Sequence, residues 1–207
     1  MSRMKLMTIV GTRPEIIRLS EVIKKCDTYF DQYFVHTGQN YDYELNQIFF
    51  DDLKLRQPDE YLDVVGDDLG QTIGNVIAKS YECLVRMSPD ALLILGDTNS
   101  CLSAIAAKRL HISVFHMEAG NRCFDECLPE ETNRRIVDHI ADVNLCYSEH
   151  ARRYLNAEGT VKERTYVVGS PMAEVLSAHM DRIEGSRVLE HLGLKSKGYI
   201  LLSAHRE

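Results

Sequence analysis

The 207-residue sequence has no apolar run that approaches the length of a membrane-spanning helix. Its amino-terminal stretch, MSRMKLMTIVGTRPE, reaches a turn and a proline after a short apolar run. It has neither the longer apolar core nor the small-residue cleavage site of a secretory signal. We therefore expect a cytoplasmic protein that does not insert into a membrane.

Several motifs are also absent. The sequence contains neither GxxxxGK[ST] nor GxGxxG, which excludes a P-loop and the dinucleotide-binding fingerprint. Its six cysteines include no CxxC pair, so we expect reduced thiols instead of a disulfide framework. Cys123 and Cys127 follow His116, but their spacing is not that of a zinc ribbon or finger. No metal and no redox cofactor is expected.

Basic residues are the minority among the charges. The chain has 24 Lys and Arg against 31 Asp and Glu, a formal net charge of −7. Nucleic-acid backbones are held by clustered Lys and Arg, so general nucleic-acid binding is not expected, whereas a small anion in a local basic pocket is compatible with this charge. The hydrophobic fraction of 44% is ample for a packed core and excludes a disordered or fibrous chain.

Short β-rich runs alternate with amphipathic helical stretches along the whole chain. Strands are expected at 5–11, 32–38, 61–65, 88–97, 112–120, 142–148, 165–170 and from 199 onward. Helices are expected at about 14–26, 43–53, 69–87, 100–110, 129–140 and 149–157, with helical segments up to 194. Uninterrupted Val, Ile and Leu in the strands indicate a parallel sheet covered on both faces, hence a doubly wound, Rossmann-like α/β domain.

Polar residues follow these strands where each one ends. The strand ends read GTR, TGQ, GDT, EAG and SAHR, and ligands of open α/β sheets bind beyond the carboxyl ends of the strands. In GTRPEIIR, a tight turn, helix-N-terminal amides, Arg13 and Arg18 are the parts of a diphosphate clamp. The same residues are equally compatible with a βα turn whose arginines pair with nearby acids.

Acidic residues gather on the same edge. Asp97, Glu118 and Glu130 could converge on one cleft, where paired carboxylates act as acid and base. Glu130 could instead stabilise the start of a helix after Pro129. Arg134 is placed either to pair with those acids or to bind a ligand, and His205 either to donate to a phosphate leaving group or to cap a loop.

Six motifs in this order, GTRPEIIR, TGQ, GDT, MEAG, PEETNR and AHRE, resemble those of the non-hydrolysing UDP-N-acetylglucosamine 2-epimerases. The resemblance spans essentially the whole chain. It implies two Rossmann-like domains of the glycosyltransferase-B type with a UDP-sugar between them. Residues 1–185 would form the first domain, and residues 186–207 the hinge and first strand of a second, UDP-binding domain that is largely absent.

The resemblance also implies roles for individual residues. Arg13, Arg18, Asp97, Glu118 and His205 would contact the substrate, and Asp97, Glu118 and Glu130 would transfer protons. His205 would thus count among the catalytic residues, and Arg134 would bind the substrate with Arg13 and Arg18. Arg18 stands where the family often has Lys, a change that keeps the charge and alters the geometry.

The reaction implied for the family expels UDP from C1, removes the C2 proton to give a 2-acetamidoglycal, and adds UDP back after protonation from the opposite face. The sequence looks most like the branch of capsule and O-antigen synthesis that forms UDP-N-acetyl-L-fucosamine from a UDP-N-acetyl-talosamine. A homodimer is expected by resemblance, and little activity is expected from these residues alone. A glycosyltransferase, a hydrolysing epimerase and a non-catalytic sugar-nucleotide sensor are the alternatives.

Overall fold

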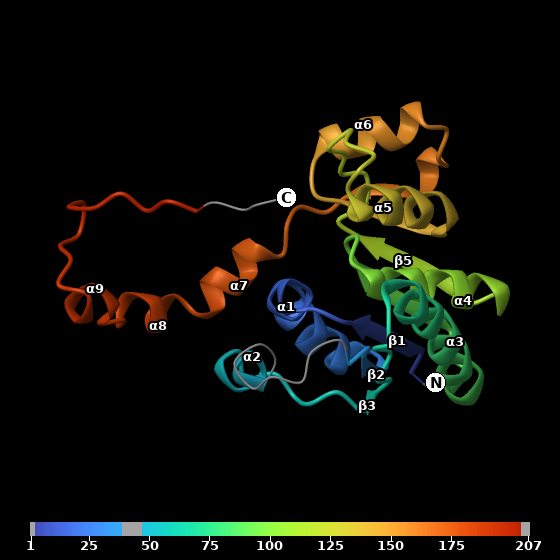
Figure 1. Cartoon of the computed structure of the whole chain (residues 1–207), viewed down its shortest axis with the longest axis horizontal. Helices are drawn as coiled ribbons and strands as arrows, with labels where there is room; N and C mark the ends of the chain where they lie inside the picture. Colours follow the sequence, from blue (N-terminus) through green and yellow to red (C-terminus); the bar gives the residue numbers. More distant parts are fainter. Residues whose placement is uncertain (1–2, 39–46, 204–207) are drawn as a thin grey trace.

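A seven-stranded parallel sheet forms the centre of the protein, in a computed structural model that describes residues 3–38 and 47–203. The strand order is β3-β2-β1-β4-β5-β6-β7, and every neighbouring pair is parallel (Figure 1). The strands are β1 (Lys5–Val10), β2 (Asp31–His36), β3 (Glu60–Tyr61), β4 (Ala91–Leu95), β5 (Ser113–Met117), β6 (Val143–Cys146) and β7 (Thr165–Val167). The predicted Rossmann-like fold is confirmed.

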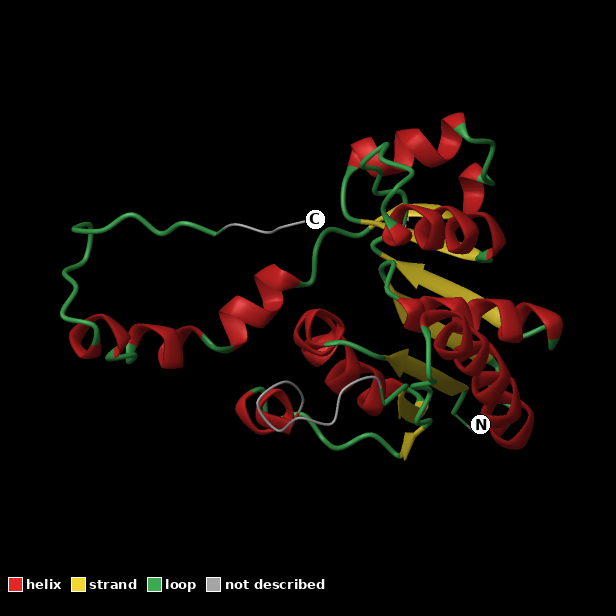
Figure 2. Cartoon of the chain, viewed as in Figure 1, coloured by secondary structure: helices red, strands yellow, loops and turns green. Residues whose placement is uncertain are grey.

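Helices connect the strands and lie on both sides of the sheet (Figure 2). They are α1 (Arg13–Tyr29), α2 (Gln47–Asp52), α3 (Leu69–Met87), α4 (Ser103–Arg109), α5 (Pro129–Ile140), α6 (Glu149–Ala157), α7 (Met172–Ala178), α8 (Met180–Glu184) and α9 (Val188–His191), with short 3-10 helices η2 (Asn99–Leu102) and η3 (Lys162–Arg164). Pro129 begins α5 and Pro14 lies in the first turn of α1, where a missing backbone N–H is tolerated. The predicted start of the second helix, at Tyr43, lies outside the described residues.

Two layers of apolar side chains cover the two faces of the sheet. Successive residues of a strand point to opposite faces, so the fully buried β4 contributes to both layers. Met7 and Ile9 of β1 lie in the layer that contains the buried faces of α3 and α4, while Leu6 lies in the layer of Leu19 and Ile23 from α1. The sheet is thereby fixed from both sides, and its carboxyl edge is left to the loops.

The end of the described chain leaves the sheet (Figure 1). Helix α7 packs on α1, and Arg182 of α8 lies 3.0 Å from the carboxylate of Asp52 at the end of α2. The strand predicted from Tyr199 is wrong for the described residues 199–203, which form no strand. Ile200 exposes 95% of its surface, and a strand needs a neighbouring strand to hold its backbone, which these residues lack within the described part of the chain.

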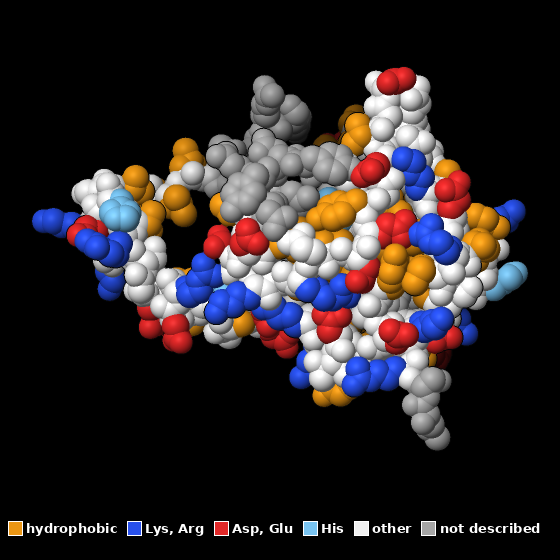
Figure 3. Space-filling model, turned by 90° about the horizontal axis from the view of Figure 1, so that it is seen from below, with side chains coloured by type: hydrophobic (Ala, Val, Ile, Leu, Met, Phe, Trp, Pro, Cys, Tyr) orange, Lys and Arg blue, Asp and Glu red, His pale blue; other side chains and the backbone are white. Residues whose placement is uncertain are grey.

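The surface carries both signs of charge. On the face in Figure 3, Lys and Arg side chains are interspersed with Asp and Glu. Within the described residues, none of the helices combines the length and the apolar character that crossing a bilayer requires.

Candidate active site

The order of the sheet reverses between β1 and β4, and this is where open α/β sheets bind ligands. Strand β1 pairs with β2 on one side and with β4 on the other. The connections that follow β1 and β4 therefore leave the carboxyl ends of these two adjacent strands in opposite directions. The loops after β1 and β4, with the loop after β5 beside them, form the carboxyl edge of the sheet. The motifs that contain the described candidate residues all lie at this carboxyl edge.

Glu15, a buried residue in the first turn of α1, joins the loop after β1 to the loop after β4. Its carboxylate accepts hydrogen bonds from the Gly11 amide at 3.0 Å, from Thr12 Oγ1 at 2.8 Å and from Thr98 Oγ1 at 3.0 Å. The Ser100 hydroxyl also donates to it. Burial raises the pKa of Glu15, and these hydrogen bonds act in the opposite direction. The candidate set from the sequence omitted Glu15, although Thr12-x-x-Glu15 has the spacing of a capping box.

Asp97, two residues after the end of β4, is held by α5. The guanidinium of Arg134 donates to its Oδ2, with Nε at 3.0 Å, and also contacts Glu131 at 2.8 Å. The side-chain amide of Asn133 donates to the Asp97 carbonyl at 2.9 Å. Arg134 is thus placed as a partner for the acids, one of the two roles predicted for it, and it fixes Asp97 at the edge of the sheet.

Glu118, directly after β5, lies in a left-handed backbone conformation with φ of +66°. Its carboxylate forms an ion pair with Arg18 and accepts from the Asn121 side chain at 3.2 Å. Burial raises the pKa of Glu118, the Arg18 charge lowers it, and the negative charge of Asp97 raises it. The net shift is upward, so Glu118 keeps its proton to a higher pH than an ordinary glutamate. The effect of the Asp97 charge on Glu118 indicates that the two carboxylates lie close together at one site.

Two other candidate residues from the sequence, Arg13 and Glu130, are not part of this cluster of paired side chains. Arg13 is exposed at the start of α1 with its guanidinium 6.0 Å from the centre of the Phe49 ring. Glu130 is exposed in the first turn of α5. His205 lies outside the described residues. The structure therefore brings together Arg18, Asp97, Glu118 and Arg134, while Arg13 and Glu130 occupy the rim of the same edge.

Glu131, next to Glu130, has a structural role. Its carboxylate accepts from the Cys123 amide at 3.2 Å and pairs with Arg134 and Arg135. Burial raises the pKa of Glu131, but the Cys123 amide and the two guanidiniums outweigh it and hold that pKa at about 2. The loop after β5 is thus tied to α5.

Tyr147, after β6, was missed in the sequence. Its hydroxyl is buried and has no hydrogen-bond partner among the described residues. Burial raises the pKa of Tyr147, the charge of Glu118 raises it further, and Arg18 lowers it. The phenol is therefore a protonated donor near Glu118. The rule that placed the other candidates at strand ends also applies to Tyr147, because it lies at the carboxyl end of the predicted strand DVNLCYS.

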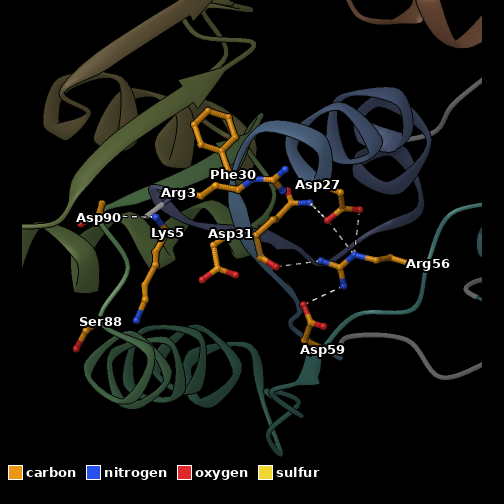
Figure 4. A pocket seen from close by; sticks show the side chains of 10 residues that line it. Arg3, Lys5, Asp27, Phe30, Asp31, Arg56, Asp59, Ser88 and Asp90 are labelled. Carbon is orange, nitrogen blue, oxygen red and sulfur yellow. Dashed lines mark hydrogen bonds and ion pairs between the residues drawn. The ribbon is translucent and has the colours of Figure 1, made fainter. Parts of the chain in front are cut away.

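A cavity of about 1100 Å³ lies at the opposite, amino edge of the sheet (Figure 4). Arg56 lines it and is paired with Asp27 at 3.0 Å and Asp59 at 2.9 Å. Arg56 therefore joins α1 to the segment before β3. Among the described residues, no group of three or more His, Cys, Asp and Glu is arranged to hold a metal ion.

Comparisons with known proteins give a consistent result. A protein-family model described as UDP-N-acetylglucosamine 2-epimerase matches residues 24–207. A UDP-N-acetylglucosamine 2-epimerase homolog of Methanococcus maripaludis is 38% identical over 206 residues, which cover 98% of this chain and 57% of that protein. The chain spans a little over half the length of the relatives it matches.

Solved structures also match this chain in sequence and in fold. A UDP-N-acetylglucosamine 2-epimerase from Rickettsia bellii is 56% identical with a TM-score of 0.93, over 99% of this chain and 55% of that one. The Methanocaldococcus jannaschii UDP-GlcNAc 2-epimerase, in complex with UDP-GlcNAc and UDP, is 34% identical with a TM-score of 0.86, over 91% of this chain and 53% of that one.

Proposed function

Because the chain belongs to the UDP-N-acetylglucosamine 2-epimerase family, we propose that the full-length protein interconverts UDP-N-acetylhexosamines that differ in configuration at C2, without net hydrolysis. The observation that carries this proposal is the pair of carboxylates at the tips of adjacent strands. Asp97 follows β4, Glu118 follows β5, and the charge of Asp97 raises the pKa of Glu118.

The chemistry explains why two acids are needed. The C2 proton of the sugar is not adjacent to a carbonyl, so it cannot be removed by simple enolisation. In the proposed reaction the bond from C1 to the diphosphate oxygen breaks, UDP leaves with the electron pair, and a carboxylate takes the C2 proton. UDP then adds back to the 2-acetamidoglycal while an acid protonates C2 from the opposite face, which requires groups on both sides of the ring.

The residues fit these roles as follows. Glu118 and Asp97 transfer protons at C2, with Glu130 at the rim as the third acid. Arg18 and Arg134 hold the two acids and are cationic beside the departing diphosphate. Arg13 and His205 bind the diphosphate as it leaves. No cofactor is required, because every bond change is a proton transfer or the departure and return of UDP.

The substrate proposed is UDP-GlcNAc and UDP-ManNAc, or the L-talosamine and L-fucosamine pair, in the synthesis of capsule or another surface polysaccharide. We further propose that residues 1–185 form the catalytic half, that 186–207 lead into a second domain binding uridine, and that two copies form a homodimer. The described residues alone would then be nearly inactive, because the glycosyltransferase-B arrangement places the sugar nucleotide between two domains.

The test is hydrogen exchange at C2. Full-length protein incubated with a UDP-N-acetylhexosamine in deuterated water should incorporate deuterium at C2 and give both epimers. Stoichiometric release of UDP with a free sugar would instead identify a hydrolysing epimerase. Absence of exchange together with a product formed on an acceptor would identify a glycosyltransferase. Asp97→Asn should abolish turnover and leave nucleotide affinity nearly intact; surviving turnover would remove Asp97 from the mechanism.

A further inference from the structure

Asp138, in the last turns of α5, is a buried carboxylate that three segments share. It is 1% exposed. Its Oδ1 lies 2.9 Å from His116 Nδ1, and its Oδ2 accepts from Arg122 Nη1 at 2.6 Å. Both oxygens also lie 3.2 Å from the Gly120 amide, which donates to them. Asp138 therefore contacts the end of β5 and the loop that follows it, and the proposed reaction gives it no role.

His116 and Asp138 resemble a general-base pair but cannot act as one. The ring of His116 is completely buried, and its Nε2 lies 2.8 Å from the Gly96 carbonyl oxygen. A carbonyl oxygen only accepts, so Nε2 carries a proton and donates it to Gly96. The nitrogen that would face a substrate in a catalytic pair is thus used by the backbone. The contacts of His116 join α5 to the tips of β5 and β4.

The segment held in this way is the one that carries Glu118. Glu118 lies midway between His116 and Gly120, and its φ of +66° is uncommon for a residue with a side chain. Gly120 also has a positive φ, of +82°. One carboxylate therefore holds the backbone turn on both sides of Glu118.

The outer end of the network reaches α6. The Arg122 side chain is fully buried, and it contacts Glu158, just after α6, through Nε at 2.8 Å and Nη2 at 2.5 Å. Burial raises the pKa of Asp138, but His116 and Arg122 outweigh it and keep that pKa below its ordinary value. Asp138 is thus ionised at neutral pH and pairs with a buried cation.

We propose that Asp138 is a positioning residue which, through His116 and the Gly120 amide, fixes the carboxylate of Glu118 where proton transfer at the sugar C2 requires it. This inference rests on the proposed function. Asp138 is buried behind the turn, so it acts on the reaction only through Glu118. Its loss should lower kcat and leave substrate affinity nearly unchanged.

The experiment uses full-length protein carrying Asp138→Asn, with UDP-GlcNAc as substrate and C2 deuterium exchange as the assay. Because a misplacement of the order of 1 Å costs about 100-fold in rate, kcat should fall by about 100-fold while KM stays within about threefold. The matched control is Asp142→Asn. Asp142 accepts from the Val114 amide at 2.8 Å and from Lys108 at 2.5 Å, at the other end of β5. That variant should lower the melting temperature and keep kcat within about twofold.

Each outcome of the experiment either supports or contradicts the positioning role of Asp138. If the wild type exchanges deuterium and folded Asp138→Asn keeps its kcat, the positioning role is wrong and the proposed function stands. If the wild type shows no deuterium exchange, both the positioning role and the proposed function are wrong. If Asp138→Asn does not fold, Glu158→Gln decides, since it removes only the outer charge of the network. A kcat reduced about threefold at unchanged KM supports the proposal, and an unchanged kcat overturns it.

Discussion

The carboxylate of Glu118 pairs with the guanidinium of Arg18 across 100 positions of sequence. The pair joins the tip of β5 to α1, so the GTRPEIIR and MEAG motifs meet in one site. The Glu118 side chain is 14% exposed, and that of Arg18 is 37% exposed. The acid is thus partly withdrawn from water and held beside a cation that faces the solvent.

Replacing Glu118 with Gln tests its role in proton transfer. The amide keeps the shape of the side chain and cannot take or give the C2 proton, so kcat should fall by about 1000-fold. Affinity for UDP should stay within about threefold, because the diphosphate is bound by cationic residues and not by the Glu118 carboxylate. Exchange kinetics and calorimetric titration with UDP measure the two quantities. Full turnover in the variant would show that another group transfers the proton.

The rule about strand ends was sufficient to place Asp97 and Glu118 on one edge of the sheet. Parallel strands of buried Val, Ile and Leu leave their polar residues at the same end, so sequence order alone predicted neighbouring tips. The pairing of Arg18 was left open in the sequence, because an arginine in a βα turn has many acids within reach. Only the packing of α1 against the sheet decides among them.

Residues on helices were harder to predict. Asp138 has an ordinary place in an amphipathic helix, and nothing in PEETNRRIVDHI indicates that this acid faces His116. Its partners depend on the rotation of α5 about its own axis. The strand predicted from Tyr199 was wrong, within the described residues 199–203, for a related reason. Apolar and aromatic composition makes a segment fit for a sheet, but a partner strand has to be present.

The Glu131 carboxylate should make stability depend on pH. Its pKa of about 2 lies below the ordinary 4.5, so its contribution is complete above pH 4.5 and is lost as the pH falls toward 2. Glu131→Gln should lower the free energy of unfolding by about 2 kcal/mol at pH 7 and by about half as much at pH 3.

Urea denaturation of both proteins at the two pH values measures this difference. Glu149→Gln is the control, because Glu149 pairs with Arg152 on the surface, where solvent screens the charges. Its effect should be smaller than that of Glu131→Gln at pH 7. An equal loss at pH 3 and pH 7 for Glu131→Gln would contradict the assigned pKa.

Gly120 and Gly159 separate the cost of a positive φ from the cost of a steric clash. Both have a positive φ, of +82° and +89°. A Cβ at Gly120 would lie 2.8 Å from the carbonyl carbon of Ala151, whereas a Cβ at Gly159 would meet nothing within 4 Å. Gly159→Ala should cost about 1 kcal/mol of stability, and Gly120→Ala at least about 3 kcal/mol, because α6 would have to move.

Thermal and urea unfolding of the two variants give these values. The Gly120 substitution should also reduce kcat, since the turn that carries Glu118 would shift, while Gly159→Ala should leave kcat unchanged. Equal destabilisation by both substitutions would mean that α6 adjusts without difficulty.

Tyr147→Phe tests whether the buried hydroxyl is a donor to the substrate. The hydroxyl has no partner among the described residues, and burial and Glu118 keep its pKa raised, so the phenol remains protonated. If it donates to an oxygen of the sugar, the Kd for UDP-GlcNAc should rise about fivefold in the variant, while the Kd for UDP is unchanged. Tyr154→Phe is the control, since Tyr154 is 39% exposed and its ring meets that of Phe124 edge to face, with 5.4 Å between the ring centres. The opposite result would be unchanged affinity for UDP-GlcNAc together with a higher unfolding temperature in Tyr147→Phe. It would show that the hydroxyl lies buried without a ligand partner, because removing an unpaired buried hydroxyl stabilises the fold.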